Sequence, residues 1–339
     1  MARIVGIGNP LWDVFAPASS NMEVVGRFGR GSVNHLSARE MKEILSGVTE
    51  VRWVAGGGAR NTLALLAALG HETYLTGAVG DDERGIGYRR ALSEAGIADC
   101  LASARREPTG TCVTLMHDTG ENTVIVSPGA ALELEDVSDT APRDPDVVIF
   151  EGFLAPRAGL AASSVDYAVQ AGATLIVDLG HPGVTPAAAA VVGAAAAQVP
   201  DGGMRPLVFG TEAEVAAAGG VERFSASAGV VVEKRGERGA AVHCGGVETA
   251  QAAAAGKVVS RGRDVSGAAA LAPGAAIIDT TGAGDVFAAA FLAARLRSMS
   301  DKRACELANL AAGMSLSSYG GRLTADQLHV FMDELMSGA

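Results

Sequence analysis

The residues best suited to do chemistry stand in the stretch DTTGAGDVFAAAF, residues 279–291. Three small residues, 282–284, directly precede the acid Asp285. The pattern predicts a strand over 275–279 and a helix over 284–296, with the small residues at the turn between them. Free backbone N–H groups at a helix start favour an anion, and small residues let a phosphate approach closely. An acid there would repel phosphate unless it has a task, such as accepting the proton of a hydroxyl that attacks a phosphoryl group.

For the four residues Gly-Ala-Gly-Asp alone, a second interpretation is equally good. The glycines would form a tight turn, and Asp285 would complement the dipole of its own helix. The stretch matches neither the P-loop nor the dinucleotide pattern G-x-G-x-x-G. The serines show no G-x-S-x-G setting, which argues against a serine hydrolase. His181, in DLGHPG, is better interpreted as a structural loop residue.

Strand-like apolar runs alternate with helical patterns along most of the chain. The predicted strands are 3–8, 73–79, 146–150, 174–178, 206–210 and 229–234, and the predicted helices include 37–45, 60–69, 82–97, 284–297, 301–318 and 324–336. This alternation predicts βαβ units and a mostly parallel sheet that is covered on both faces. Residues 10–35 lack a helical pattern, and residues 109–127 read as two strands joined at DTGEN. We expect these two regions to form a small β layer beside the main sheet.

Composition excludes several classes of function. The 339 residues suggest two domains, or one large α/β domain with an appendage. The net charge of −11 without a basic stripe argues against a nucleic-acid partner. The four cysteines show no CxxC spacing, which disfavours a metal site or a disulfide framework. The small-apolar run 187–199 is too short to span a bilayer. We therefore expect a cytoplasmic protein that binds neither membrane nor nucleic acid.

These stretches together resemble the PfkB (ribokinase-like) family of carbohydrate and nucleoside kinases. DTTGAGDVFAAAF is similar to the C-terminal signature of the family, and VAGGGARNTLALLAALG (54–70) to its N-terminal Gly-Gly…Asn segment. LTGAVGDDERG (75–85) resembles the piece that follows, PTGT (108–111) the start of the lid hairpin, and GNPLWD (8–13) the opening of adenosine-kinase-like members. The pieces keep the family order over nearly the whole chain, and the two signatures together are highly specific. The resemblance implies one ribokinase-like α/β domain, residues 1–339. Its doubly wound, mostly parallel sheet would be flanked by helices, with a small β lid from about 10–35 and 98–127.

The resemblance also implies roles for single residues. Asp285 would be the catalytic base, and the backbone of Gly282, Ala283 and Gly284 would form the anion hole for the transferred phosphate. The hydroxyls of the substrate would be bound by Asp13, Gly57, Gly58 and Asn61. Many members bind a monovalent cation such as K⁺ where Asp279 and Thr281 fall. Alone, Asp13 would be interpreted as a turn acid and Asn61 as a helix cap.

The nucleotide half departs from the family pattern. Where many relatives have Asn-x-x-Glu, this chain has TEAE, so Thr211 replaces the Asn while Glu214, expected to order water around Mg²⁺, is kept. EKRGERGA (233–240) resembles the strand and turn beside the ATP phosphates, which implies nucleotide contacts for Lys234, Gly236 and Gly239. Lys234 stands where relatives often have Thr. Asn309 falls where the adenine usually lies, and a buried structural Asn is an equally good interpretation.

The expected function is ATP-dependent phosphorylation of a primary hydroxyl on a small-molecule sugar or nucleoside, with Mg²⁺. Adenosine kinase is the first alternative, supported by GNPLWD. A sugar phosphate is a less favoured acceptor because the lid turn HDTGENT supplies no Lys or Arg for a second phosphate. The second alternative is a non-catalytic sugar- or nucleoside-binding protein on the same scaffold, which the departures at Thr211 and Lys234 would fit. A homodimer through the lid is also compatible with the resemblance.

Overall fold

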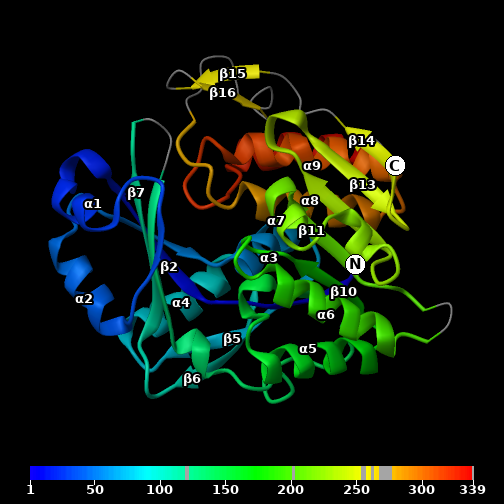
Figure 1. Ribbon diagram of the computed structural model, residues 1–339, viewed down its shortest axis with the longest axis horizontal. Coiled ribbons are helices and arrows are strands. Elements are labelled where there is room, and N and C mark those ends of the chain that lie inside the picture. The colour runs from blue at the N-terminus through cyan, green and yellow to red at the C-terminus, as the bar shows by residue number, and fades with distance from the viewer. Residues whose placement is uncertain (119–121, 201–202, 253–256, 261–262, 267–276, 338–339) are drawn as a thin grey trace.

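A nine-stranded sheet lies at the centre of the structure (Figure 1). The computed structural model describes residues 1–339 except 119–121, 201–202, 253–256, 261–262, 267–276 and 338–339. The strand order is β14-β13-β12-β11-β10-β9-β1-β5-β6. In chain order these strands are β1 (Arg3–Ile7), β5 (Glu72–Gly80), β6 (Ala98–Ala104), β9 (Val147–Glu151), β10 (Thr174–Asp178), β11 (Leu207–Thr211), β12 (Val230–Lys234), β13 (Ala240–Cys244) and β14 (Val247–Ala252). The strands from β12 to β6 are parallel, and β13 and β14 are antiparallel additions at the edge.

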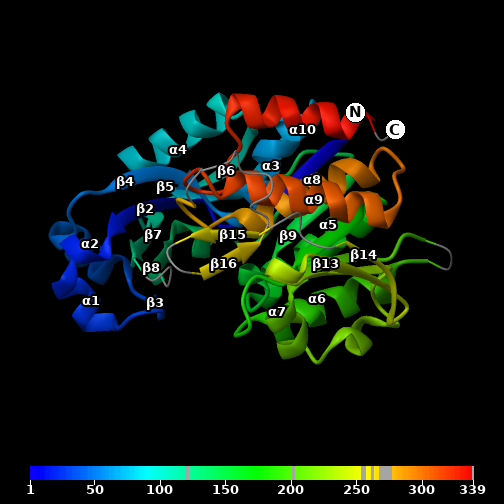
Figure 2. The same ribbon diagram turned by 90° about the horizontal axis from the view of Figure 1, so that it is seen from above.

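Helices cover both faces of this sheet (Figure 2). One face carries α3 (Gly58–Ala68), α4 (Glu83–Glu94), α8 (Ala283–Arg295), α9 (Asp301–Ser315) and α10 (Ala325–Ser337). The other face carries α5 (Ala158–Gln170), α6 (Thr185–Gln198) and α7 (Glu212–Ala217). Successive side chains of a strand point to opposite faces, so Ile4 joins the first core and Val5 the second. The doubly wound α/β fold expected from the sequence is thereby confirmed.

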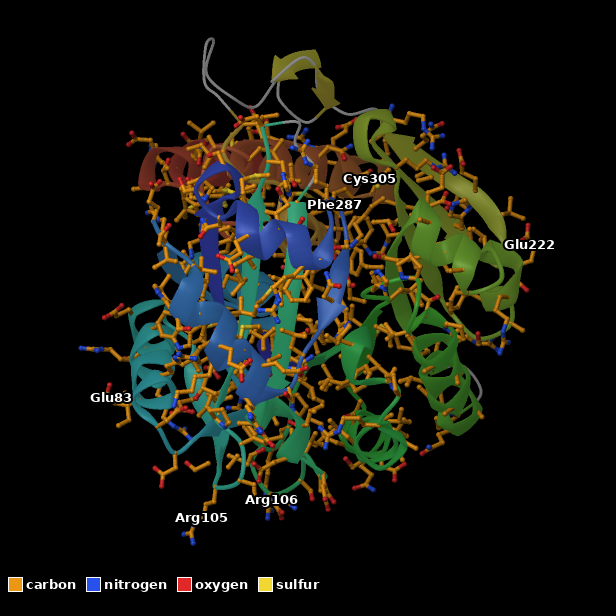
Figure 3. The ribbon with its side chains drawn as sticks, turned by 60° about the vertical axis from the view of Figure 1, so that its left-hand side comes forward. Glu83, Arg105, Arg106, Glu222, Phe287 and Cys305 are labelled. Carbon is orange, nitrogen blue, oxygen red and sulfur yellow. The ribbon has the colours of Figure 1, made fainter. Side chains whose placement is uncertain are left out.

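Three phenylalanines hold α8 against the sheet. The rings of Phe209 on β11 and Phe291 on α8 lie edge to face with their centres 5.5 Å apart, and Phe287 stacks along the same helix. Figure 3 shows Phe287 within the body of the molecule, whereas Glu83 and Arg105 lie at its periphery. Because α8 begins with the expected catalytic stretch, this aromatic packing sets the position of Asp285.

A separate five-stranded sheet, order β3-β8-β7-β2-β4, lies at one end of the molecule. Its strands are β2 (Leu11–Pro17), β3 (Val33–His35), β4 (Arg52–Gly56), β7 (Thr109–Met116) and β8 (Asn122–Gly129). The helices α1 (Met22–Phe28) and α2 (Ala38–Gly47) pack on one face of it through Val24, Met41 and Ile44. The capping box of α2 between Ser37 and Glu40 is formed as the sequence predicts. We call this sheet with its two helices the lid.

The structure corrects the expected composition of the lid. Residues 10–35 contain the short helix α1, whose buried valines 24 and 25 do not produce a recognisable helical period in so short a segment. Residues 98–104 form β6, which pairs with β5 in the main sheet rather than with the lid. The fifth lid strand is β4, which leads directly into the Gly-Gly segment.

One further prediction concerns the segment that leads into α8. The expected strand over 275–279 falls partly outside the described residues, and residues 277–279 are not in a strand. Instead, Ile278 N–H bonds to the carbonyl of Leu316 after α9. A small two-stranded sheet, β15 (Lys257–Ser260) and β16 (Arg263–Ser266), also lies in this part of the chain. In the described part of the chain, we find no helix with the length and apolar character needed to cross a membrane.

Candidate active site

The start of α8 is built to bind an anion. Gly282 is the residue before the helix, with φ of 77°, and a Cβ on it would lie 2.8 Å from Cα of Gly321. Only glycine suits this position, since it combines a left-handed backbone with a close approach. Among the described residues no side chain caps α8. The backbone N–H groups of Ala283 and Asp285 donate to the carbonyls of Thr280 and Gly282, which leaves the N–H of Gly284 as the group of this turn that is most available to a ligand.

Asp285 sits in the first turn of α8 and is held by two residues of α3. The Nδ2 of Asn61 donates to Oδ2 of Asp285 at 3.0 Å, and the hydroxyl of Thr62 donates to its backbone carbonyl at 3.2 Å. Burial raises the pKa of Asp285 to about 8, reinforced by the charge of Asp178, although Asn61 and Lys234 oppose the shift. Asn61 therefore orients this carboxyl group rather than capping its own helix.

The Gly-Gly segment brings α3 close to the same point. Gly57 has φ of 100°, and a Cβ on it would lie 2.3 Å from the carbonyl oxygen of Asn9. A Cβ on Gly58 would lie 3.3 Å from Oδ1 of Asp285, so this glycine leaves room beside the acid. Asp13, on β2, lies against Gly56, where a Cβ would be 1.9 Å from its Oδ2. Burial and the charge of Asp279 raise the pKa of Asp13 to about 7.

A cavity of about 220 Å³ opens beside Asp285. It lies at the carboxyl ends of the parallel strands, where ligands of open α/β sheets bind. Its wall includes Gly58, Thr62, Glu151, Asp178, Glu214, Lys234, Gly282, Gly284 and Asp285. Four residues predicted for different roles, namely the base, two anion-hole glycines and Lys234, thus meet at one cavity.

Lys234 extends from the end of β12 into this cavity. Its Nζ lies 3.2 Å from Oδ2 of Asp178, and a Cβ on Gly284 would lie 3.2 Å from the same nitrogen. Burial lowers the pKa of Lys234, but the carboxylates of Asp178, Glu214 and Asp285 outweigh it and hold the pKa above its ordinary value. The ammonium therefore stays charged beside the start of α8.

Two acids of the cavity were missed by sequence reasoning. Glu151 ends β9 and accepts hydrogen bonds from the backbone N–H groups of Asn9 and Ala59. Burial raises the pKa of Glu151 to about 7. Asp178 ends β10, next to β9 in the sheet. The available signal was an acid directly after each buried apolar run, VVIFE and TLIVD, at the edge where parallel sheets bind ligands.

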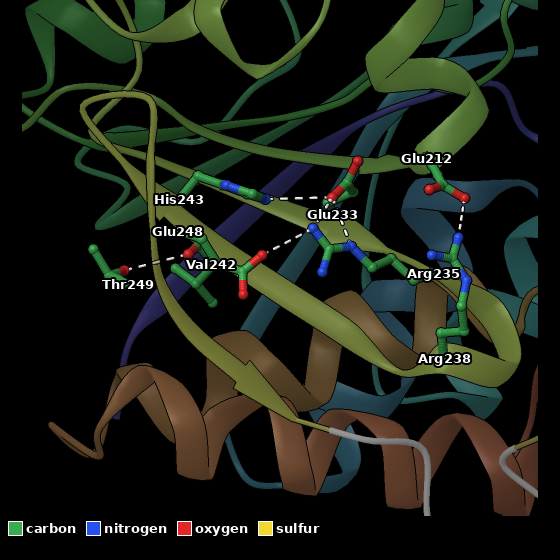
Figure 4. A network of polar contacts seen from close by, with 8 residues as sticks. All are labelled: Glu212, Glu233, Arg235, Arg238, Val242, His243, Glu248 and Thr249. Atoms are coloured by element: carbon green, nitrogen blue, oxygen red, sulfur yellow. Dashed lines mark hydrogen bonds and ion pairs between the residues drawn. The ribbon is translucent and has the colours of Figure 1, made fainter.

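The turn after β12 is held by charge pairs (Figure 4). The guanidinium of Arg235 lies 2.7 Å from Glu233 and 3.0 Å from Glu248, and His243 also contacts Glu233. Arg238 pairs with Glu212 at the start of α7. Gly236 and Gly239 have positive φ values of 55° and 83°, which explains both glycines as turn residues. Since these arginines are already paired, Lys234 is the basic residue that this segment directs into the cavity.

The remaining predicted residues are placed as follows. Glu214 forms a capping box with Thr211, so the replacement of Asn by Thr keeps a good helix start, and Glu214 still lines the cavity. Asn309 donates to the carbonyl of Ala252 on β14, which joins α9 to the sheet edge. Asp279 accepts hydrogen bonds from the backbone N–H groups of Thr281 and Gly320, and it thereby ties the turn before α8 to the turn after α9. His181 accepts from Gly183 N–H as a loop residue.

The donor set of the cavity fits magnesium bound together with a polyphosphate. The carboxylates of Asp178 and Glu214 line it, and hard cations prefer such oxygens. Over the residues that the structure describes, no group of three or more His, Cys, Asp or Glu side chains could hold a metal by itself. Mg²⁺ commonly binds through one or two carboxylates and completes its shell with phosphate oxygens and water, so these residues suit it.

Comparisons with known proteins place the chain among sugar and nucleoside kinases. The profile of the pfkB family carbohydrate kinases matches residues 31–328. An ATP-dependent ribose-1-phosphate kinase from Halopiger xanaduensis is 29% identical, covering 98% of this chain and 99% of that protein, and a ribokinase from Arabidopsis thaliana is 26% identical over 79% and 68%. The structure is similar to an adenosine kinase from Sinorhizobium meliloti (TM-score 0.79, 21% identity, 98% and 99% covered). It is equally similar to a probable sugar kinase from Rhizobium etli (TM-score 0.79, 22% identity, 98% and 99% covered).

Proposed function

The chain belongs to the pfkB family of carbohydrate kinases, and we propose that it transfers the γ-phosphoryl group of ATP to a primary hydroxyl of a sugar or nucleoside, with Asp285 as the general base. One observation supports this assignment above the others. The half-buried Asp285 stands at the uncapped start of α8, is oriented by Asn61, and faces a cavity that the side chain of Lys234 also lines. A base, an anion site and a cation are the parts that phosphoryl transfer needs.

The acceptor lies between the lid and the start of α3. In this proposal Asp13, Gly57, Gly58 and Asn61 bind the acceptor. Gly58 and Asn61 lie beside Asp285, and Asp13 lies against Gly56, from where its carboxylate can accept hydrogen bonds from two neighbouring hydroxyls. The hydroxyl to be phosphorylated donates its proton to Asp285. A base with a pKa of about 8 is well matched to a proton transfer near neutral pH.

The negative charge of the transferred group is met by the start of α8 and by Lys234. In this proposal the backbone of residues 282–284 binds the transferred phosphate, and the Nζ of Lys234 lies beside Gly284. In relatives with Thr at this position the ammonium would be missing, so Lys234 adds a positive charge that the usual pattern lacks. Mg²⁺, bound with ATP near Asp178 and Glu214, would neutralise further phosphate charge.

The proposal has four finer parts. Closure of the lid would exclude water and limit ATP hydrolysis, since the lid strand β2 contains Asp13 and the lid strand β4 ends directly before Gly57. Val33 and Trp53, exposed on the two edge strands of the lid, support a homodimer through this sheet. A K⁺ site at Asp279 and Thr281, and a cytoplasmic location, where ATP is supplied, stay predictions.

The deciding experiment is a screen for acceptor-dependent ATP consumption. The panel contains ribose-1-phosphate, which is the acceptor named for the haloarchaeal relative, together with ribose, fructose, hexose phosphates, adenosine, inosine and cytidine. We expect one acceptor to stimulate ADP formation in the wild type and not in Asp285→Asn. Binding of an acceptor without any ADP formation would instead support a non-catalytic binding protein, and preference for adenosine would select the adenosine kinase alternative.

A further inference from the structure

Arg60 is a buried cation with unsatisfied hydrogen-bonding groups. Arg60 stands in the first turn of α3, next to Asn61, and only 3% of this residue is exposed to solvent. In the described part of the chain, neither Nε nor Nη1 of Arg60 has a hydrogen-bond partner. A buried guanidinium without partners is costly, because the lost hydration is not replaced. An unpaired buried cation is more readily explained at a ligand-binding site, where a ligand can compensate its charge, than in a hydrophobic core.

A second arginine approaches the same place from the other end of the chain. Nη2 of Arg322 donates to the carbonyl of Ala55 on β4 at 3.1 Å. Partial shielding of the guanidinium from solvent and the positive charge of Arg60 lower the pKa of Arg322 to about 10, which indicates that the two guanidinium groups repel each other. No salt bridge joins either arginine to an acid within the residues that the structure covers. Asp13 is the nearby acid whose charge attracts both arginines, and burial raises its own pKa to about 7.

Both arginines line a cavity of about 260 Å³. Its wall is formed by the outer side of α3 and by the ends of α4, α8 and α10, with Ala64, Val286, Gly321 and Leu328 among its residues. The exposed Glu94 lies on the rim. None of the residues that line the cavity beside Asp285 lines this one. The two cavities are nevertheless neighbours, because Val286 follows Asp285 and Gly321 packs against Gly282.

We propose that Arg60 and Arg322 form a binding site for a phosphate or carboxylate group of a small molecule. The guanidinium fork presents paired N–H donors that match such anions, and a desolvated fork binds them more strongly than an exposed one. An anion in this cavity would contact Arg322 and the part of the Arg60 guanidinium that lines it, and its charge would offset that of the buried cation, whose Nε and Nη1 have no partner. The anion is either carried by the acceptor or is a free phosphate. This site exists whether or not the chain transfers phosphoryl groups.

The proposal changes the expectation about phosphorylated acceptors. The sequence argument disfavoured them because the lid turn contains no Lys or Arg. The structure supplies the cations from two other places, the first turn of α3 and the segment after α9, which lie more than 250 residues apart in the chain.

The test measures binding of inorganic phosphate, without nucleotide, by calorimetry and by thermal unfolding. The proteins are the wild type, Arg60→Met, Arg322→Met, and Arg105→Met as a matched control on an arginine that points away from the molecule (Figure 3). Lys234→Met is included because phosphate could also enter the cavity beside Asp285. Loss of charge-assisted hydrogen bonds should weaken binding about 10- to 100-fold in each of the first two variants. Arg105→Met and Lys234→Met should retain this binding.

The temperature of thermal unfolding gives a second readout, in which Arg60→Met has a different expected effect without phosphate and with it. Without phosphate, Arg60→Met should unfold at a higher temperature than the wild type, since it removes an uncompensated buried charge. With phosphate the wild type should gain stability and the variant should not. Arg322 is exposed, so Arg322→Met keeps the test valid even if Arg60→Met fails to fold. Equal phosphate affinity in the wild type, Arg60→Met and Arg322→Met would overturn the proposal.

Acceptor kinetics then identify where the anion comes from. If the acceptor carries it, Arg322→Met raises KM for ribose-1-phosphate but not for ribose or adenosine, and free phosphate competes with the acceptor. If the anion is free phosphate, the variant loses phosphate binding while all acceptor KM values stay unchanged. Either result is consistent with an anion site at Arg60 and Arg322. The phosphate titration tests this site even if the chain proves not to be a kinase.

Discussion

Asp285→Asn separates the two interpretations of the acid at the start of α8. The substitution keeps the shape of the side chain and its hydrogen bond with Asn61, but it removes the base. Loss of general-base catalysis costs about 10²–10⁴ in rate, which is about 3–5 kcal/mol in activation free energy. We expect kcat to fall by this factor, with KM for ATP and for the acceptor little changed. Steady-state ADP release with the best acceptor measures it.

The same variant should be more stable than the wild type. The pKa of Asp285 rises from 3.8 to about 8 on folding, mainly through burial, which corresponds to on the order of 5 kcal/mol against the ionised, folded form. A raised folded pKa means that stability is fully present below about pH 4 and is lost progressively up to about pH 8. Asn carries no charge, so the gain in Tm should grow from pH 5 to pH 8 and reach several degrees. Differential scanning calorimetry at both pH values tests this.

The wild-type pH profile provides an independent check. Asp285 must be ionised to accept a proton, so kcat/KM should fall about tenfold for each pH unit below the pKa of about 8. Asp326→Asn is the matched control, because Asp326 is an exposed acid in the first turn of α10. If Asp285 only complements its helix dipole, Asp285→Asn would instead lose about 0.3–1 kcal/mol of stability and turn over normally. Near-wild-type kcat would refute the mechanism proposed here.

Three other predictions address the remaining residues. Asp13→Ala should raise KM for the acceptor strongly and leave KM for ATP unchanged, as measured by steady-state kinetics; an unchanged acceptor KM would make Asp13 a turn residue. Lys234→Met should lower kcat by about 10²-fold through the loss of one charge at the transferred group, whereas Lys42→Met on the lid helix α2 should have no such effect. Replacing Na⁺ by K⁺ at constant ionic strength should raise activity if Asp279 and Thr281 frame a cation, and equal rates would remove K⁺ from the reaction.

Much of the fold followed from local patterns. The helices expected over 284–297 and 301–318 appear as α8 (Ala283–Arg295) and α9 (Asp301–Ser315). Both are long segments rich in Ala and Leu, which favour helix, and α8 is buried continuously from Val286 to Ala294. The parallel strands could be predicted from continuous apolar runs, because both faces of a parallel sheet are buried. The errors fell on α1, which is too short to show a period, and on β6, whose sheet is chosen by pairing with β5 and not by its own residues.

The candidate site, like the fold, has parts that the sequence predicts and parts that only the tertiary structure reveals. The stretch Gly282–Asp285 could be singled out from the sequence because its chemistry depends on neighbours in the chain: small residues, an acid and a helix start. Glu151 and Asp178 gave only a weak signal, an acid after a buried apolar run, because they meet Asp285 only after β9 and β10 pack side by side. Arg60 reads as an ordinary helix residue beside Asn61, and only the packing of the segment around Arg322 makes it a buried, unpaired cation. Desolvation and Coulomb interactions depend on distances in space, so the pKa of Asp285 and the charge around Arg60 were decided by the tertiary structure alone.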